Sequence, residues 1–270
     1  MSREVLSLPI PPKLIKILRS ASYVVVLTGA GISAESNIPT FREAQTGLWA
    51  KYSPEELATP QAFRRNPRLV WEWYAWRREL VSKAAPNPGH LALAQLETYF
   101  TQHATDTMSP TSLWDTPRFT LITQNVDGLH QRAGSQNVIE LHGNINRTKC
   151  FEENTIIESW AQSDEVPPPC PHCGGLLRPD VVWFGETLPQ PALDAAIAAA
   201  HTCDLFLSIG TSALVHPAAS LPYYALQSNA ILVEINPDET PLSAMATFAL
   251  HGPAGRILPN LFEALENSSF

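Results

Sequence analysis

Short apolar runs rich in valine, isoleucine and leucine recur along the chain, each close to a helical pattern or a turn. Five of them read YVVVLTGAG, RFTLITQNVD, NVIELHG, DLFLSIGTS and AILVEINPD. Nearly continuous apolar strands separated by helices are typical of a parallel sheet that helices cover on both faces. Each run ends in a polar tail that contains glycine or asparagine. Because an open parallel sheet binds ligands at the carboxyl ends of its strands, we expect the functional residues in these tails.

Two long stretches do not fit this alternation. The first, at about 43–88, is helical and rich in aromatic residues, and the second, at about 147–179, contains three of the four cysteines. We interpret both as insertions that form one small module on top of the sheet. The expected fold class is α/β, a Rossmann-like parallel sheet with helices on both faces plus a smaller helical and zinc-ribbon-like module. A single domain spanning 1–270 would take its sheet core from approximately 10–42, 89–146 and 180–270.

Composition narrows the class of function. The formal net charge of −8 argues against direct binding of nucleic acid, because a negative surface repels phosphates, and makes a basic peptide a better match. Lys13, Lys16 and Arg19 are not followed by a continuous apolar run, so we expect no signal peptide, no membrane span and a cytoplasmic location. Four cysteines in such a chain indicate thiols or metal ligands rather than disulfides.

The first apolar run leads into TGAGISAES, in which Gly29, Gly31 and Ala34 match the G-x-G-x-x-G/A spacing. Glycine at these positions lets the chain turn tightly and lets N–H groups approach a pyrophosphate. The alternative is a tight turn from strand to helix without a ligand. A dehydrogenase would also need an acidic residue at the end of a second strand about twenty residues later. The corresponding stretch, WAKYSPEELATP, has no strand pattern.

The segment after the glycine turn carries Pro39, Phe41 and Arg42 instead. An aromatic ring and a guanidinium beside a dinucleotide could shape and close a pocket over it, whereas the alternative is an ordered loop with a solvated arginine. Later strand tails add further polar groups.

TQNVDGLH places Gln124, Asn125 and Asp127 after one strand, and VIELHGN places His142 after the next. An imidazole can take up a proton near neutral pH. A lone histidine is more often structural, but the polar neighbours of His142 at the same sheet edge favour a catalytic role.

Taken together, these motifs resemble the sirtuin family of NAD-dependent protein-lysine deacylases. The segments GAGISAES, IPTFR, TQNVDGLH, ELHGN, VVWFGE, GTS and EINPDET stand in the family's order between residues 29 and 240. One departure is Asn37, where the family usually has glycine. Since asparagine tolerates positive φ better than most residues, we expect little effect.

The resemblance implies a role for each matching position. His142 and Asn125 would be catalytic, with His142 as the general base. Val182, Trp183 and Phe184 would pair with the substrate backbone and cover the acyl-lysine. The cofactor NAD would be bound by Gly29, Ala30, Gly31, Ala34, Pro39, Phe41, Arg42, Trp49, Gln124, Asn125, Asp127, Gly210, Thr211, Ser212, Asn236 and Ala254. Acyl-lysine proteins or peptides would be the partners, and the products would be nicotinamide, O-acyl-ADP-ribose and free lysine.

The acyl group is addressed by Tyr74 and Arg77, which are three residues apart and therefore lie on one helical face. A guanidinium beside a phenol is suited to bind a carboxylate. The alternative is that Trp71, Tyr74 and Arg78 pack against the sheet and Arg77 is solvated. The Tyr-x-x-Arg pattern looks like the sirtuin branch that removes succinyl, malonyl or glutaryl groups, so we expect acidic acyl groups to be preferred, with acetyl also removed.

The cysteines raise a separate question. Sirtuins usually bind a structural zinc with two Cys-x-x-Cys pairs, and this chain has Cys150, Cys170 and Cys173 with Glu153 at the fourth position. A carboxylate can ligate zinc, so a site of three sulfurs and one oxygen is chemically reasonable. The alternative is that no zinc is bound and that the proline-rich segment 167–171 and local packing keep the module folded.

Two further classes of protein would use the same predicted pocket. An NAD glycohydrolase or an ADP-ribosyltransferase would also cleave the bond to nicotinamide. A non-catalytic NAD-binding protein would keep the pocket without turnover.

Overall fold

The computed structural model describes residues 10–39, 52, 54–102 and 118–267. Its centre is a six-stranded sheet in the order β3-β2-β1-β6-β7-β8, and every neighbouring pair is parallel. The strands are β1 (Val24–Thr28), β2 (Phe119–Thr123), β3 (Val138–Glu140), β6 (Leu205–Ile209), β7 (Ile231–Asn236) and β8 (Phe248–His251). The Rossmann-like α/β fold predicted from the apolar runs is confirmed.

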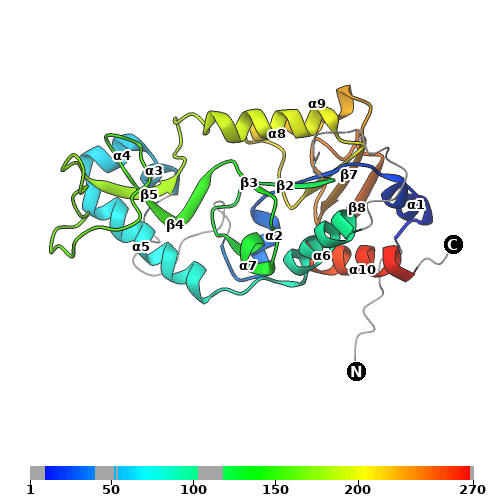
Figure 1. Cartoon of the computed structure of the whole chain (residues 1–270), viewed down its shortest axis with the longest axis horizontal. Helices are drawn as coiled ribbons and strands as arrows, with labels where there is room; N and C mark the ends of the chain where they lie inside the picture. Colours follow the sequence, from blue (N-terminus) through cyan, green and yellow to red (C-terminus); the bar gives the residue numbers. More distant parts are fainter. Residues whose placement is uncertain (1–9, 40–51, 53, 103–117, 268–270) are drawn as a thin grey trace.

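Helices cover both faces of this sheet, as Figure 1 shows. One face packs against α1 (Pro12–Ser20), α6 (Pro88–Gln102) and α10 (Ala254–Asn267), and the other against α8 (Gln190–Thr202) and α9 (Leu221–Gln227). Side chains alternate between the two cores along each strand, so that Val24 and Val26 lie in the first and Val25 and Leu27 in the second. Burial on both faces explains why the strands read as continuous apolar runs.

A smaller group of elements lies at the far end of the molecule in Figure 1. It contains α3 (Pro54–Leu57), α4 (Pro60–Arg65), α5 (Pro67–Lys83) and an antiparallel pair, β4 (Gly143–Cys150) with β5 (Leu177–Val181). Thr59 and Asn66 begin α4 and α5, and their side chains accept hydrogen bonds from Ala62 N–H and Leu69 N–H. The division of the chain into a core and a module at the predicted boundaries stays a prediction.

Aromatic side chains hold the smaller group together. Phe63, Trp73, Tyr74 and Trp183 are each at most 2% exposed and form one apolar cluster with residues of β4 and β5. Three further short helices lie in the described residues: α2 (Ala30–Ala34), α7 (Leu129–Ala133) and the 3-10 helix η2 (Ala218–Ser220). Within the described part of the chain, no helix has the length and apolar character that a membrane crossing requires.

Candidate functional site

The strand order reverses at β1, and the segments that follow β1 and β6 meet there. Gly31 N–H donates a hydrogen bond to the carbonyl of Gly210 at 2.8 Å. A Cβ atom on Gly31 would lie 2.7 Å from that oxygen, and one on Gly210, whose φ is +59°, would lie 2.5 Å from the nitrogen of Ile32. Only glycine fits on both sides of this contact. The close packing of the two strand tails therefore requires glycine at positions 31 and 210. This requirement adds to the access for a phosphate that the spacing of the glycines predicts.

A buried polar network lies directly behind this contact. The side-chain amide of Asn125 donates to the carbonyl of Gly29 at 3.0 Å and to the hydroxyl of Ser33 at 3.1 Å. Ser33 in turn donates to Asp127 at 2.8 Å, and the second Asp127 oxygen accepts from Leu129 N–H at 2.9 Å. Burial raises the pKa of Asp127, and these two hydrogen bonds act against that shift. The predicted Asn125 and Asp127 are thus held rigidly beside the glycine turn.

His142 lies between β3 and β4 and is half-buried. Its Nδ1 atom is 2.9 Å from the backbone oxygen of Gln124. A carbonyl oxygen only accepts, so Nδ1 carries the proton and Nε2 keeps its lone pair. Burial lowers the pKa of His142 below its ordinary value of 6.5, and the bond to Gln124 acts in the other direction. The imidazole is therefore neutral at neutral pH and can accept a proton at Nε2.

The other predicted cofactor residues occupy several places around the same edge. The side chain of Gln124 donates to Thr211 at 3.1 Å, which joins the tails of β2 and β6. Asn236 ends β7, and Ala254 begins α10 and is 4% exposed. Ser212 and Pro39 are half-buried, whereas Ala30 and Ala34 are exposed. Phe41, Arg42 and Trp49 lie outside the described residues.

Four buried residues near the site were not predicted from the sequence. They are Ser33, Asn87, His90 and His130. His130 is 2.9 Å from the Thr28 hydroxyl, and its ring centre is 4.8 Å from that of His90. Burial lowers the pKa of His90 to about 4 and that of His130 to about 3, so both are neutral near pH 7. Ser33 and His130 lie inside the motifs GAGISAES and TQNVDGLH, so their place in these motifs could have indicated them from the sequence.

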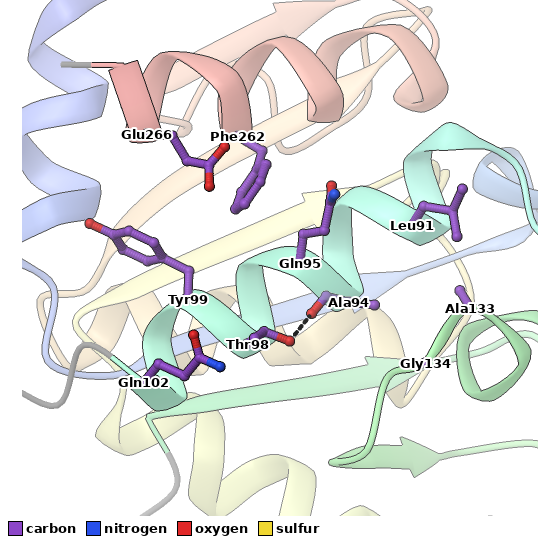
Figure 2. A pocket seen from close by; sticks show the side chains of 10 residues that line it. All are labelled: Leu91, Ala94, Gln95, Thr98, Tyr99, Gln102, Ala133, Gly134, Phe262 and Glu266. Atoms are coloured by element: carbon purple, nitrogen blue, oxygen red, sulfur yellow. Dashed lines mark hydrogen bonds between the residues drawn. The ribbon is translucent and has the colours of Figure 1, made fainter.

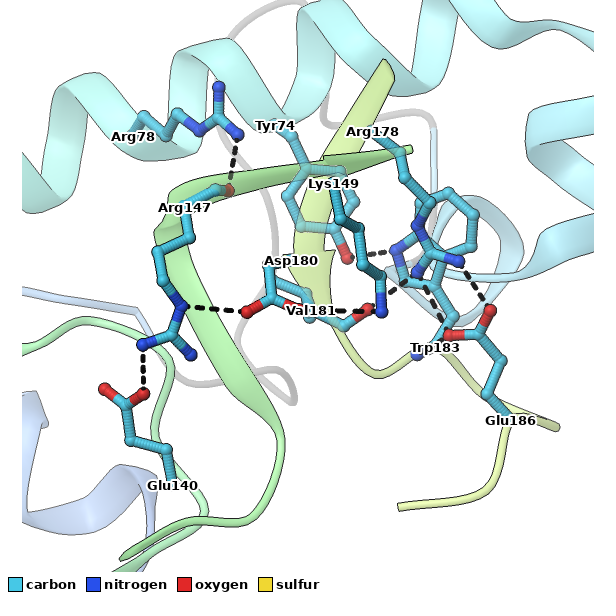
Figure 3. A network of polar contacts seen from close by, with 10 residues as sticks. All are labelled: Tyr74, Arg78, Glu140, Arg147, Lys149, Arg178, Asp180, Val181, Trp183 and Glu186. Carbon is cyan, nitrogen blue, oxygen red and sulfur yellow. Dashed lines mark hydrogen bonds and ion pairs between the residues drawn. The ribbon is translucent and has the colours of Figure 1, made fainter. Parts of the chain in front are cut away.

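The segment that follows β5 connects the histidine to the aromatic module. Val182 N–H donates to the carbonyl of His142 at 2.9 Å. The indole N–H of the next residue, Trp183, donates to the hydroxyl of Tyr74 at 2.9 Å (Figure 3). Phe184 is 47% exposed, so its side chain is accessible. The chain from 182 to 184 thus connects His142 to the predicted acyl-binding pair.

Tyr74 and Arg77 lie together on the buried face of α5. Their exposed fractions are 2% and 7%, so the alternative in which Arg77 is solvated is wrong. The Arg77 guanidinium lies 5.2 Å from the ring centre of Trp73. Burial raises the pKa of Tyr74 to about 12, although the Arg77 charge and the Trp183 hydrogen bond lower it. The phenol is therefore protonated at neutral pH.

The predicted metal ligands converge although they come from two segments of the chain. Cys150, Glu153, Cys170 and Cys173 each offer a donor atom, and these atoms lie within 4.8 Å of one another. Sulfurs around a tetrahedral zinc ion with bonds of about 2.3 Å are roughly 3.8 Å apart, so the widest separation needs to close by about 1 Å. The Sγ atoms of Cys150 and Cys173 are 3.4 Å apart. Three thiols and a carboxylate therefore fit a zinc ion in both type and position.

A hollow of about 580 Å³ lies elsewhere, between α6, α7 and α10 (Figure 2). Its lining contains Tyr99 and Glu266 as ionisable side chains and none of the predicted site residues. The predicted site residues therefore lie outside this hollow.

Known proteins resemble this chain in sequence and in structure. The profile of the Sir2 family matches residues 29–109 and 111–217. The chain belongs to the Sir2 family. It is 51% identical over 243 residues to an NAD-dependent protein deacylase of Aquifex aeolicus, covering 90% of this chain and 95% of that protein. The identity to the NAD-dependent protein deacylase of Pyrococcus furiosus is 49% over 262 residues, covering 94% and 97%.

Solved structures of the family superpose over nearly the whole chain. A Sir2 homolog–NAD complex is 45% identical, has a TM-score of 0.84 and covers 97% of this chain and 96% of its own. A complex of Sir2 with a p53 peptide and NAD+ is 32% identical, has a TM-score of 0.77 and covers 93% and 97%. The fold and the family inferred from the motifs are confirmed.

Proposed function

We propose that this Sir2-family protein is an NAD-dependent protein-lysine deacylase that forms nicotinamide, O-acyl-ADP-ribose and free lysine. The observation that carries the proposal is the half-buried His142, whose Nδ1 atom is fixed by the Gln124 carbonyl at the strand tips where the Asn125 network also ends. Relatives about 50% identical are named NAD-dependent protein deacylases, and a related structure contains NAD. We assign the NAD site to the strand-tip residues predicted above.

The residues divide the work as follows. Bound NAD would supply an electrophilic sugar carbon and the nicotinamide leaving group. His142 accepts a proton at Nε2 from a ribose hydroxyl, because its Nδ1 is already committed to Gln124. Asn125 and Asp127 are fixed by buried hydrogen bonds, so they present a preorganised surface. Residues 182–184 hold the acyl-lysine over this site and exclude water from it.

The test is His142→Ala, with His201→Ala as the control because His201 is an exposed histidine on α8. We expect His142→Ala to bind NAD nearly as well as the wild type, measured by calorimetry, and to lose deacylation of an acyl-lysine peptide. The control should keep both. Deacylation at the wild-type rate in His142→Ala would refute the assignment.

Acyl-peptide dependence separates the alternative enzymes. A deacylase releases nicotinamide only when an acyl-lysine peptide is present, whereas an NAD glycohydrolase releases it from NAD alone. A non-catalytic NAD-binding protein gives no release under either condition.

We infer that acidic acyl groups, succinyl or malonyl, are preferred over acetyl. The support is the buried pair Tyr74 and Arg77, which the Trp183 hydrogen bond ties to the proposed substrate segment. Arg77→Met should lower desuccinylation far more than deacetylation. Arg68→Met, on the exposed side of the same helix, is the matched control. Equal losses on succinyl and acetyl peptides in Arg77→Met would rule out a carboxylate-binding role for Arg77.

We also propose that Cys150, Glu153, Cys170 and Cys173 hold a structural zinc ion. The convergence of their donor atoms within 4.8 Å supports this. Zinc would stabilise the fold of the smaller module, and none of the proposed reacting groups belongs to this set.

A further inference from the structure

The hydrogen bond between Trp183 and Tyr74 has a fixed direction. An indole N–H can donate but has no lone pair to accept, so the phenol oxygen of Tyr74 must be the acceptor at 2.9 Å. Both side chains are almost fully buried, at 1% and 2% exposure. Water therefore does not compete for either group.

The same bond determines what the Tyr74 proton can do. The phenol keeps its proton, because burial raises the pKa of Tyr74 to about 12. With one side of the oxygen occupied by the indole N–H, the O–H is directed elsewhere. Among the described residues, none accepts a hydrogen bond from it, while Arg77 lies one helical turn further along α5. A phenol O–H and a guanidinium are thus presented together, and both are donors suited to an anion.

Trp183 is itself held in place by a second set of contacts (Figure 3). The guanidinium carbon of Arg178 lies 3.2 Å from the centre of the indole ring. Arg178 donates to the two carboxylate oxygens of Glu186 at 2.5 and 3.0 Å, and to the carbonyl of Val181 at 2.7 Å. Glu186 also accepts from the backbone N–H of Trp183 at 2.8 Å. The indole is therefore clamped between a buried cation and its own turn.

We propose that Trp183 is a positioning residue for acyl specificity: its indole N–H occupies the acceptor side of Tyr74, so that the phenol must donate to the distal carboxylate of an acidic acyl group. This rests on the proposed acidic preference and deepens it. Phenylalanine at position 183 would still stack against Arg178 but has no N–H to donate to Tyr74. The Tyr74 hydroxyl would then be free to rotate and to accept other hydrogen bonds, so it would donate less consistently to the carboxylate.

The experiment compares Trp183→Phe, Tyr74→Phe and the double variant on succinyl-lysine and acetyl-lysine peptides of one sequence. We expect Trp183→Phe to lower the ratio of succinyl to acetyl kcat/KM about 3- to 10-fold, which corresponds to one ordinary hydrogen bond. The change should appear mainly in KM for the succinyl peptide, because the contact is remote from the reacting atoms. Trp160→Phe, at a partly exposed tryptophan outside the site, is the matched control.

The double variant separates positioning from packing. If Trp183 acts through the phenol, the succinyl-to-acetyl ratio of Trp183→Phe/Tyr74→Phe equals that of Tyr74→Phe alone. If the two effects on the ratio add, or if Trp183→Phe leaves the ratio unchanged, the inference is overturned. If Arg77→Met nevertheless loses the preference for succinyl over acetyl peptides, the proposed acidic preference stands and only the role of Trp183 is refuted. A wild-type enzyme without that preference refutes both the acidic preference and the role of Trp183.

The indole resonance gives a readout that does not depend on turnover. In a sample with ¹⁵N-labelled tryptophan, the Trp183 Nε1–H signal is assigned by its loss in Trp183→Phe. Tyr74→Phe should move this signal upfield and speed its exchange with solvent, and an unmoved signal would contradict the hydrogen bond on which the inference rests.

Discussion

Glu186→Gln tests whether the buried ion pair with Arg178 holds the turn that carries the proposed substrate segment. Arg178 is 3% exposed and Glu186 is 23% exposed in their side chains. Glutamine keeps nearly the same shape and one acceptor oxygen but removes the charge. The variant therefore leaves a buried guanidinium without the carboxylate that faces it at 2.5 Å.

The magnitude follows from burial. Removing one partner of a fully buried pair costs about 3–5 kcal/mol, because the remaining charge is uncompensated. Glu186 is partly exposed, so we expect the free energy of unfolding to fall by about 2 kcal/mol, or about 4 °C in Tm for a chain of this length. The matched control is Glu72→Gln, which breaks the exposed pair with Arg68 on α5. An exposed pair of this kind contributes about 0.3–0.5 kcal/mol, so its Tm should move by less than about 1 °C.

The same pair gives a pH dependence of known sign. Burial raises the pKa of Glu186, but the hydrogen bond and charge of Arg178 outweigh this and hold it below the ordinary value of 4.5. A carboxylate whose folded pKa is lowered stabilises the protein above its unfolded pKa, and this contribution is lost as the pH falls through the folded pKa. Thermal unfolding of wild type and Glu186→Gln should therefore differ at pH 7 and converge below about pH 4.5. A Tm difference no larger than that of Glu72→Gln, or one that does not shrink in acid, would refute the reasoning.

Three further predictions address the base, the metal and the glycine contact. Because the pKa of His142 is lowered, kcat/KM for deacylation should rise with pH through an ionisation below 6.5 and stay level to pH 8; an ionisation above 6.5 would contradict the assignment. Purified wild type should contain near-stoichiometric zinc by elemental analysis, and Glu153→Ala should lose most of it while Glu158→Ala does not; absence of zinc from the wild type favours a remnant site. Gly210→Ala places a Cβ 2.5 Å from Ile32 N, whereas in Gly134→Ala the nearest atom is 3.9 Å away. Urea unfolding should therefore show a larger fall in the free energy of unfolding for Gly210→Ala than for Gly134→Ala. Equal falls would show that the positive φ of each glycine, and not the close contact, decides the loss of stability.

Much of the fold could be predicted because it rests on local patterns. Strands buried on both faces read directly as apolar runs, and their polar tails predict that the functional residues lie at one edge of the sheet. Asn37, expected to tolerate positive φ, has a φ of +59°.

The site could be predicted only as far as residue type. The contact of His142 Nδ1 with the Gln124 carbonyl depends on how the tails of β2 and β3 lie relative to each other, which no residue pattern encodes. The bond from Trp183 to Tyr74 joins residues 109 positions apart, so neither motif alone contains it. The buried pair His90 and His130 was missed for a similar reason, since the two histidines are far apart in the sequence and contact each other only in the folded chain.

The central claim is that nicotinamide release is coupled to removal of an acyl group from lysine. The most direct measurement is mass spectrometry of the products when NAD is incubated with acetyl, malonyl, succinyl and glutaryl peptides and without peptide. The account predicts equal amounts of nicotinamide, deacylated peptide and O-acyl-ADP-ribose, with the most product from an acidic acyl peptide. Nicotinamide formed at the same rate without any peptide would contradict it.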